Sequence, residues 1–187
     1  IAVGTSFEEV IADPQVQAVV LATPHSTHRA QVEAAAAAKK HIYCEKPFAL
    51  SKADAAAALE ACRRAGVVIA VGHHFRLMPS MRVLDELAKA AGVGEQVAAI
   101  TERAMRGEGN YSHDWLANMP ADSWRMAAQE SRAGGMTGMG IHVLDCFRDL
   151  IGPMKRISAL SKARAVKLPT GDTTAALIEF ENGATGT

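Results

Sequence analysis

The stretch Cys44-Glu45-Lys46-Pro47 stands at the expected junction of a strand and a helix. The apolar run at residues 41–43 is typical of a strand, and Ser51 begins a well-capped helix a few residues later. In open α/β sheets, ligands bind just beyond the carboxyl ends of the strands. Lys46 therefore lies where a ligand-binding lysine would be placed, although Glu45 and Lys46 could equally be solvated charges of a loop.

Uninterrupted apolar runs surround this junction. Residues 18–22 and 67–71 lack the polar alternation of half-exposed strands, which is typical of strands covered on both faces in a parallel sheet. Ser6 and Ser51 are suited to cap helices, and Gly66 is suited to end one. The resulting order, helix and strand in alternation, predicts an α/β fold with a doubly wound parallel sheet of the Rossmann type.

The second half of the chain has another pattern. We expect helices at 80–91 and 141–151 and strands at 96–105, 155–167 and 173–180. Asn182-Gly183 is a strong signal for a two-residue hairpin turn, and strands joined by a hairpin are antiparallel. This half is therefore predicted to be an α+β domain with an open, mainly antiparallel sheet.

These patterns predict two partial domains. Residues 1–73 are expected to be the C-terminal part of a nucleotide-binding domain, and 74–187 an incomplete substrate-binding or oligomerisation domain. The chain has no Gly-x-Gly-x-x-Gly turn, so we expect any phosphate-binding turn to lie upstream of Ile1. It starts without methionine and stops just after the hairpin, which favours an internal piece of a longer protein.

The composition of the chain argues against some classes of binding partner. The formal net charge of zero gives no basic surplus for nucleic acid or for an anionic membrane, and no apolar run is long enough to span a bilayer. Three widely spaced cysteines favour reduced thiols in the cytoplasm. Unpaired sheet edges favour association with another chain, so we expect a homo-oligomer formed through the second-domain sheet. The expected substrate is a small molecule.

Four sequence blocks, in this order and at these separations, resemble the Gfo/Idh/MocA family of glucose–fructose oxidoreductases and inositol dehydrogenases. The blocks are Ala22-Thr23-Pro24-His25-Ser26-Thr27-His28, Glu45-Lys46-Pro47, Gly72-His73-His74-Phe75-Arg76 with Pro79, and Gly134-Gly135 through Gly140-Ile141-His142 to Asp145. The resemblance spans nearly the whole chain. It implies a dehydrogenase or reductase that uses NAD or NADP and acts on a sugar, a cyclitol or a related alcohol or carbonyl compound.

The resemblance also implies roles for individual residues. Lys46 and His142 match the family's catalytic pair, and a cis peptide is implied at Lys46-Pro47. The cofactor-binding positions are Thr23, Pro24, His28, Glu45, Lys46 and Pro47. Trp124 and Arg125 match a loop segment that often faces the substrate. We also expect His74, Arg76 and Asp145 to bind substrate, because His74 follows a strand end and Asp145 lies about one helical turn beyond His142.

Several alternatives stay open. Gly138 occupies a position where the family often has aspartate, so the chain could be an inactive ligand-binding or regulatory member, or a dehydrogenase for cyclic dihydrodiols. His142 could be a core histidine, and the pair His73-His74 could be structural. A metal site built from His25, His28 and Cys44 is disfavoured, because no further ligand follows at a diagnostic spacing. Cys44 is expected to be an inert buried thiol.

Overall fold

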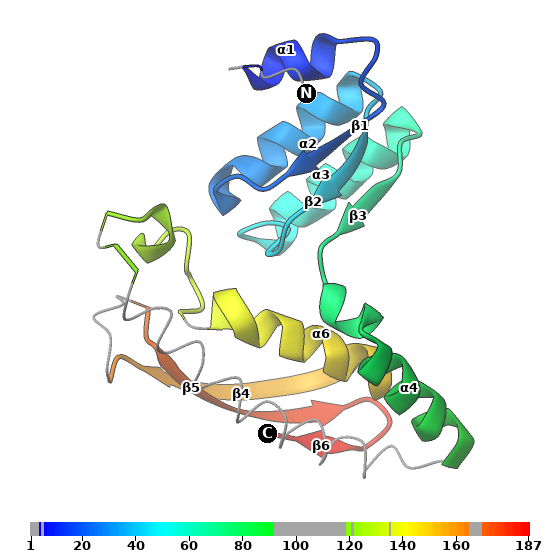
Figure 1. Cartoon of the computed structure of the whole chain (residues 1–187). Helices are drawn as coiled ribbons and strands as arrows, with labels where there is room; N and C mark the ends of the chain where they lie inside the picture. Colours follow the sequence, from blue (N-terminus) through cyan, green and yellow to red (C-terminus); the bar gives the residue numbers. More distant parts are fainter. Residues whose placement is uncertain (1–3, 5, 92–118, 121, 135, 165–169) are drawn as a thin grey trace. The chain divides into compact units, whose positions relative to one another are not determined.

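The computed structural model describes residues 4, 6–91, 119, 120, 122–134, 136–164 and 170–187 (Figure 1). The chain divides into two compact units, Ile1–Gly72 and His73–Thr187. The strand predicted at 96–105 lies outside the described residues, and so does most of the loop that follows it.

A three-stranded parallel sheet forms the centre of the first unit, in the order β1-β2-β3. The predicted alternation of helices and strands is confirmed. The elements are α1 (Phe7–Ala12), β1 (Ala18–Leu21), the 3-10 turn η1 (His25–Thr27), α2 (His28–Ala37), β2 (His41–Cys44), α3 (Lys52–Ala65) and β3 (Ile69–Val71).

Local capping explains where these helices begin and end. The Ser6 hydroxyl accepts a hydrogen bond from the Glu9 amide at 3.3 Å, and the Ser51 hydroxyl accepts one from the Asp54 amide at 3.1 Å. Each bond satisfies an amide that the first helical turn leaves without a partner. Gly66 ends α3 with φ of 69°, a left-handed conformation that favours glycine.

Helices α2 and α3 lie side by side against one face of the sheet (Figure 1). The core between them contains Val19, Leu21, Val32, Ala35, Ala36, Ile42, Cys44, Ala58 and Cys62. The prediction that both faces are covered is wrong for the chain as described, because Val20 is 72% exposed and Val68 is 66% exposed. Both covering helices pack on the same face, so alternate side chains of each strand point away from the core.

The second unit places one helix, α6 (Ile141–Leu150), against an antiparallel sheet of order β4-β5-β6. In Figure 1, α6 lies along this sheet. The Phe147 ring of α6 meets the Phe180 ring of β5 edge-on, with the ring centroids 6.2 Å apart. The elements are η2 (His74–Leu77), α4 (Pro79–Ala91), η3 (Trp124–Met126), the π-helical turn η4 (Met136–Gly140), α6 (Ile141–Leu150), β4 (Met154–Lys162), β5 (Thr173–Phe180) and β6 (Thr185–Gly186).

The predicted hairpin is confirmed, because β5 and β6 pair antiparallel and Gly183 adopts φ of 91°. The prediction of a two-residue turn is wrong, because the register pairs Ile178 with Gly186 and Glu179 with Thr185, which centres the turn on Asn182. The strand predicted at 155–167 runs instead from Met154 to Lys162. The Asp172 amide donates to the Lys162 carbonyl at 3.1 Å, just before β5 begins. Within the part of the chain that is described, no helix is both long enough and apolar enough to cross a lipid bilayer.

Candidate functional site

The turn that carries Lys46 begins where β2 ends and is held from both neighbouring strands. The Glu45 amide donates to the Leu21 carbonyl at 2.8 Å, and the Gly72 amide donates to the Cys44 carbonyl at 2.9 Å. Because the three strands are parallel, their carboxyl ends lie on one rim. The turn is therefore part of the rim at which the sequence predicts ligand binding.

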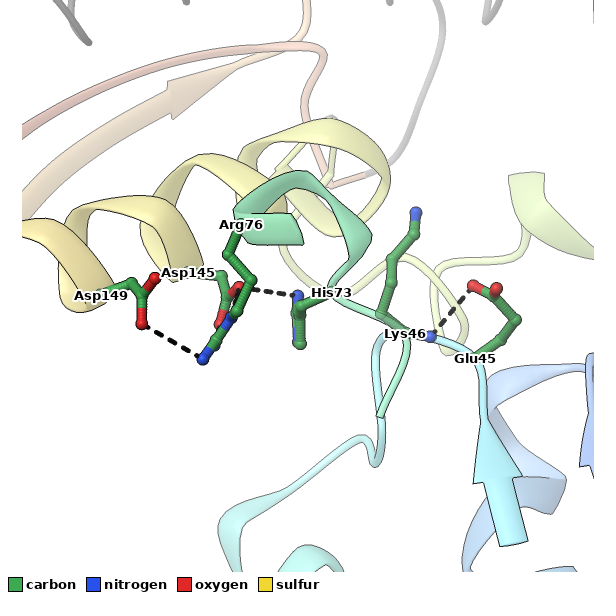
Figure 2. Close-up of polar contacts among 6 residues, drawn as sticks. All are labelled: Glu45, Lys46, His73, Arg76, Asp145 and Asp149. Carbon is green, nitrogen blue, oxygen red and sulfur yellow. Dashed lines mark hydrogen bonds and ion pairs between the residues drawn. The ribbon is translucent and has the colours of Figure 1, made fainter. Parts of the chain in front are cut away.

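The peptide bond between Lys46 and Pro47 is cis, as the family resemblance implied. Figure 2 shows Glu45 and Lys46 leaving this turn as neighbours, with the Glu45 carboxylate accepting a hydrogen bond from the Lys46 amide at 3.2 Å. Both side chains are half-buried, and Pro47 is buried. The turn therefore presents its two charged groups from a backbone fixed by local and inter-strand bonds.

Gly72 makes room for side chains of this rim. A Cβ atom at Gly72 would lie 2.6 Å from the Tyr43 hydroxyl oxygen and 3.3 Å from a carboxylate oxygen of Glu45. The absence of a side chain therefore lets the Tyr43 hydroxyl and the Glu45 carboxylate approach the end of β3.

Burial, followed by the charge of Glu45, raises the pKa of the Cys44 thiol to about 12. Cys44 is thus held as a neutral thiol, which agrees with its predicted inert role.

His28 sits beneath the rim as the first residue of α2, and its side chain is fully buried. Its Nδ1 lies 3.0 Å from the Pro47 carbonyl oxygen, and its Nε2 lies 3.1 Å from the Thr23 carbonyl oxygen. The sequence placed this residue among the cofactor contacts. In the structure, both ring nitrogens face the backbone of the rim.

The Thr23 hydroxyl is also engaged within the rim. It donates to the side-chain oxygen of Gln31 at 2.5 Å and accepts from the Thr27 hydroxyl at 3.0 Å. Sequence reasoning missed Gln31 and Thr27 as supporting residues. The available signal was spacing, because positions 27 and 31 are one helical turn apart at the start of α2.

In the second unit, η2 packs on α6 through aromatic rings. His142, on the first turn of α6, is only 2% exposed, and its ring stacks on Phe75 with centroids 4.4 Å apart and an interplanar angle of 14°. The exposed His74 meets the His142 ring edge-on at 5.0 Å, and His73 does so at 5.9 Å. The structure therefore brings two further imidazoles against the predicted acid/base residue.

A charged cluster lies one helical turn further along α6, as Figure 2 shows. The Arg76 guanidinium binds both carboxylate oxygens of Asp145, with 2.8 Å from Nε to Oδ2, and its Nη1 lies 3.5 Å from Asp149. The hydrogen bond to Asp145, more than its charge, raises the pKa of Arg76. Arg76 and Asp145, both predicted substrate contacts, thus bind one another here.

Trp124 and Arg125 form the short turn η3. The Arg125 guanidinium carbon lies 4.2 Å from the centroid of the Trp124 ring, a cation–π contact. The Ser131 hydroxyl closes this segment by donating to the Arg125 carbonyl at 2.6 Å. The two predicted substrate-binding residues therefore form an aromatic ring with a cation over one face.

The predicted residues fall into two groups. Thr23, Pro24, His28, Glu45, Lys46 and Pro47 gather in the first unit, and His74, Arg76, Trp124, Arg125, His142 and Asp145 belong to the second. The convergence of Lys46 and His142 on one substrate stays a prediction. Among the described residues, no group of three or more His, Cys, Asp or Glu side chains is arranged to hold a metal ion.

Two family models match this chain. Residues 1–73 match an oxidoreductase family with an NAD-binding Rossmann fold, and residues 103–187 match the Gfo/Idh/MocA C-terminal domain. The chain belongs to the Gfo/Idh/MocA oxidoreductase family. The later part of a Rossmann-type sheet followed by an antiparallel sheet is the fold order that these two family domains imply.

Curated Gfo/Idh/MocA relatives include 2,7-anhydro-N-acetylneuraminate hydratase of Escherichia coli K12, which is 32% identical over 148 residues, 79% of this chain and 37% of the relative. Another is 1,5-anhydro-D-fructose reductase of Ensifer adhaerens, which is 30% identical over 181 residues, 96% of this chain and 51% of the relative. The chain thus spans about half, or less, of the length of these curated relatives.

The same fold is found in solved Gfo/Idh/MocA structures. A levoglucosan dehydrogenase in complex with NADH and levoglucosan superposes with a TM-score of 0.79 at 24% identity, over 98% of this chain and 50% of that chain. An NAD-binding oxidoreductase from Klebsiella pneumoniae superposes with a TM-score of 0.78 at 25% identity, over 97% of this chain and 49% of that chain.

Proposed function

We propose that the complete protein is an NAD(P)-dependent oxidoreductase that transfers a hydride between nicotinamide and a hydroxyl or carbonyl group of a sugar, cyclitol or related small molecule. The observation that carries this proposal is the position of Lys46. The lysine leaves a turn at the carboxyl end of a parallel sheet, and backbone bonds hold that turn from both neighbouring strands. The names of the curated relatives, a fructose-derivative reductase among them, support the substrate class.

The rim suits the nicotinamide half of a dinucleotide. Thr23, Pro24, Glu45, Lys46 and Pro47 follow the ends of β1 and β2, where ligands bind in such sheets. Bound NAD(P)+ supplies a hydride acceptor, and NAD(P)H supplies the hydride for the reverse reaction. Lys46 is proposed to hold the substrate hydroxyl next to this rim.

Oxidation of an alcohol also requires removal of the hydroxyl proton, and the reverse reaction requires its return. We assign this proton transfer to His142, with Lys46 binding the same oxygen and stabilising negative charge on it. His74, Trp124 and Arg125 are proposed to line the substrate. Arg76 and Asp145 stay predicted substrate contacts, and a substrate group would have to replace part of their ion pair to reach them.

The two units are proposed to act as the end of the nucleotide-binding domain, 1–73, and as part of the substrate domain, 74–187. We further propose a homo-oligomer through the β4–β5–β6 sheet, where Leu160 is 62% exposed and Leu177 is 59% exposed. A cytoplasmic location is supported by the cysteines Cys44, Cys62 and Cys146, which are all free thiols and buried.

The test is turnover by the complete gene product. NADH and NADPH absorbance is followed with a panel of sugars, anhydro sugars, cyclitols and dihydrodiols, and dinucleotide binding is measured by calorimetry. Lys46→Ala should lower kcat/KM by about 100-fold or more, the range expected when a positioned proton-transfer or oxyanion-binding group is lost. Lys52→Ala is the matched control, because Lys52 is an exposed lysine on the first turn of α3. Full activity of Lys46→Ala would remove the lysine from the mechanism, and failure to bind either dinucleotide would refute the proposed function.

A further inference from the structure

His28 links two loops that come from different strands. One ring nitrogen, Nδ1, lies 3.0 Å from the carbonyl of Pro47, the residue that follows Lys46. The other, Nε2, lies 3.1 Å from the carbonyl of Thr23, two residues beyond β1. Both ring nitrogens of this buried side chain are thus taken up by backbone carbonyls, so neither is available to a cofactor in this conformation.

The position of the proton on the His28 ring decides which of the two contacts is a hydrogen bond. Carbonyl oxygens only accept hydrogen bonds, and a neutral imidazole has a single N–H group. A proton on Nδ1 stabilises the turn that carries Lys46, whereas a proton on Nε2 stabilises the loop after β1. The imidazole that packs against His28 is that of His25, edge-on at 5.8 Å between ring centroids.

We propose that His28 is a positioning residue, whose Nδ1–H donates to the Pro47 carbonyl and thereby fixes the turn that presents Lys46. This inference rests on the proposed role of Lys46. The Pro47 carbonyl lies one residue beyond Lys46, so loss of the bond changes the direction in which the lysine leaves the rim. The Glu45 amide and the Gly72 amide hold the strand side of the turn. On the helix side, His28 adds its contact with the Pro47 carbonyl to the packing of Phe48 against the core.

Two substitutions separate the ring nitrogens. In His28→Asn the side-chain amide nitrogen can occupy the position of Nδ1, because both are bonded to Cγ, so the donor to Pro47 is kept and the contact with Thr23 is lost. In His28→Gln the amide nitrogen reaches the more distant position of Nε2, so the donor to Pro47 is lost. Both variants lose one contact and the imidazole volume, so a purely structural role predicts similar effects for both.

The experiment measures kcat, both KM values and the melting temperature of the complete protein, at a temperature where every variant is folded. We expect His28→Asn to keep kcat within about threefold and His28→Gln to lower it about 10- to 100-fold, the scale at which small misplacements of catalytic groups act. The KM for the dinucleotide should change less than kcat. His25→Gln is the matched control and should keep kcat within about twofold.

Equal losses of kcat in the two variants, or unchanged kcat with lowered melting temperatures in both, would overturn the proposal. If neither variant folds, nitrogen NMR of histidine-labelled wild-type protein decides instead, because a protonated Nδ1 of His28 supports the proposal and an unprotonated one refutes it. The two hypotheses fail separately. Retained turnover in Lys46→Ala refutes the role of Lys46, whereas loss in Lys46→Ala with full activity in His28→Gln refutes only the positioning role.

Discussion

Replacing Arg76 with methionine tests how the segment before α4 is held against α6. Methionine keeps much of the apolar stem of arginine and removes the charge and all five N–H donors. The guanidinium binds both oxygens of Asp145 and approaches Asp149 at 3.5 Å. The variant therefore removes one bidentate ion pair and one weak contact and leaves most of the packing in place.

The magnitude follows from burial. The Asp145 side chain is 10% exposed and that of Arg76 is 38% exposed. Exposed ion pairs contribute about 0–1 kcal/mol, whereas removing one partner of a fully buried pair costs about 3–5 kcal/mol. A pair with one buried and one half-exposed partner should lie between these limits, at about 2 kcal/mol. Since about 1.4 kcal/mol is a factor of ten, local opening of α6 should become about 30-fold more frequent.

Amide hydrogen exchange of α6 measures this opening directly and does not require the whole protein to unfold in one step. The amides of residues 146–150 should exchange about 30-fold faster in Arg76→Met. Arg82→Met is the matched control, because Arg82 is exposed on α4, and its exchange pattern in α6 should match that of the wild type.

A double-mutant cycle with Asp145→Asn completes the test. The coupling free energy between the two substitutions should be about 1–2 kcal/mol, since each one removes the same ion pair. A coupling below about 0.3 kcal/mol, or unchanged exchange in Arg76→Met, would show that the pair is too well solvated to hold η2 on α6.

Three further outcomes follow from the first unit. Gly72→Ala should lower the free energy of unfolding by about 1–3 kcal/mol, because its methyl group would overpack against Tyr43. The loss should be smaller in a Tyr43→Phe background, which lacks the nearest atom, the hydroxyl oxygen. Strictly additive losses in chemical denaturation would contradict this reasoning. Because burial raises the pKa of Cys44 from 9.0 to about 12, the folded state keeps a proton that the unfolded state releases. Stability should therefore fall as pH rises above about 9, and less steeply in Cys44→Ala; parallel pH profiles would count against it. Ser51→Ala should cost about 1 kcal/mol and Ser51→Thr much less, as measured by urea denaturation, because the threonine hydroxyl can still accept from the Asp54 amide and donate to the Asp54 carboxylate.

Much of the fold was predictable because its signals are local. The apolar runs before Thr23 and Lys46 and the serine caps at Ser6 and Ser51 each depend on a few neighbouring residues. Local signals of this kind predict where strands and helices begin and end, and they placed the Lys46 turn at a strand end. The cis bond before Pro47 came from the family resemblance, and the hairpin at Gly183 came from its turn residues.

Tertiary structure alone decided which polar groups distant in the sequence meet. His28 and Pro47 are separated by 19 residues, and Arg76 and Asp145 by 69, so no periodicity in the sequence links them. The sequence identified Arg76 and Asp145 as separate ligand contacts, whereas the fold pairs their charges. Which distant groups form a hydrogen bond or an ion pair depends on which elements pack together, and that packing depends on the whole core.

The exposed face of the first sheet is a second feature that the sequence could not predict. The sequence determined that Val20 belongs to a strand, because an apolar run of that length between turn signals has few alternatives. It did not determine whether a layer covers that side chain, because hydrophobicity sets only the preference for burial. The packing of α2 and α3 on one face decided that, for the residues described, Val20 points away from the core.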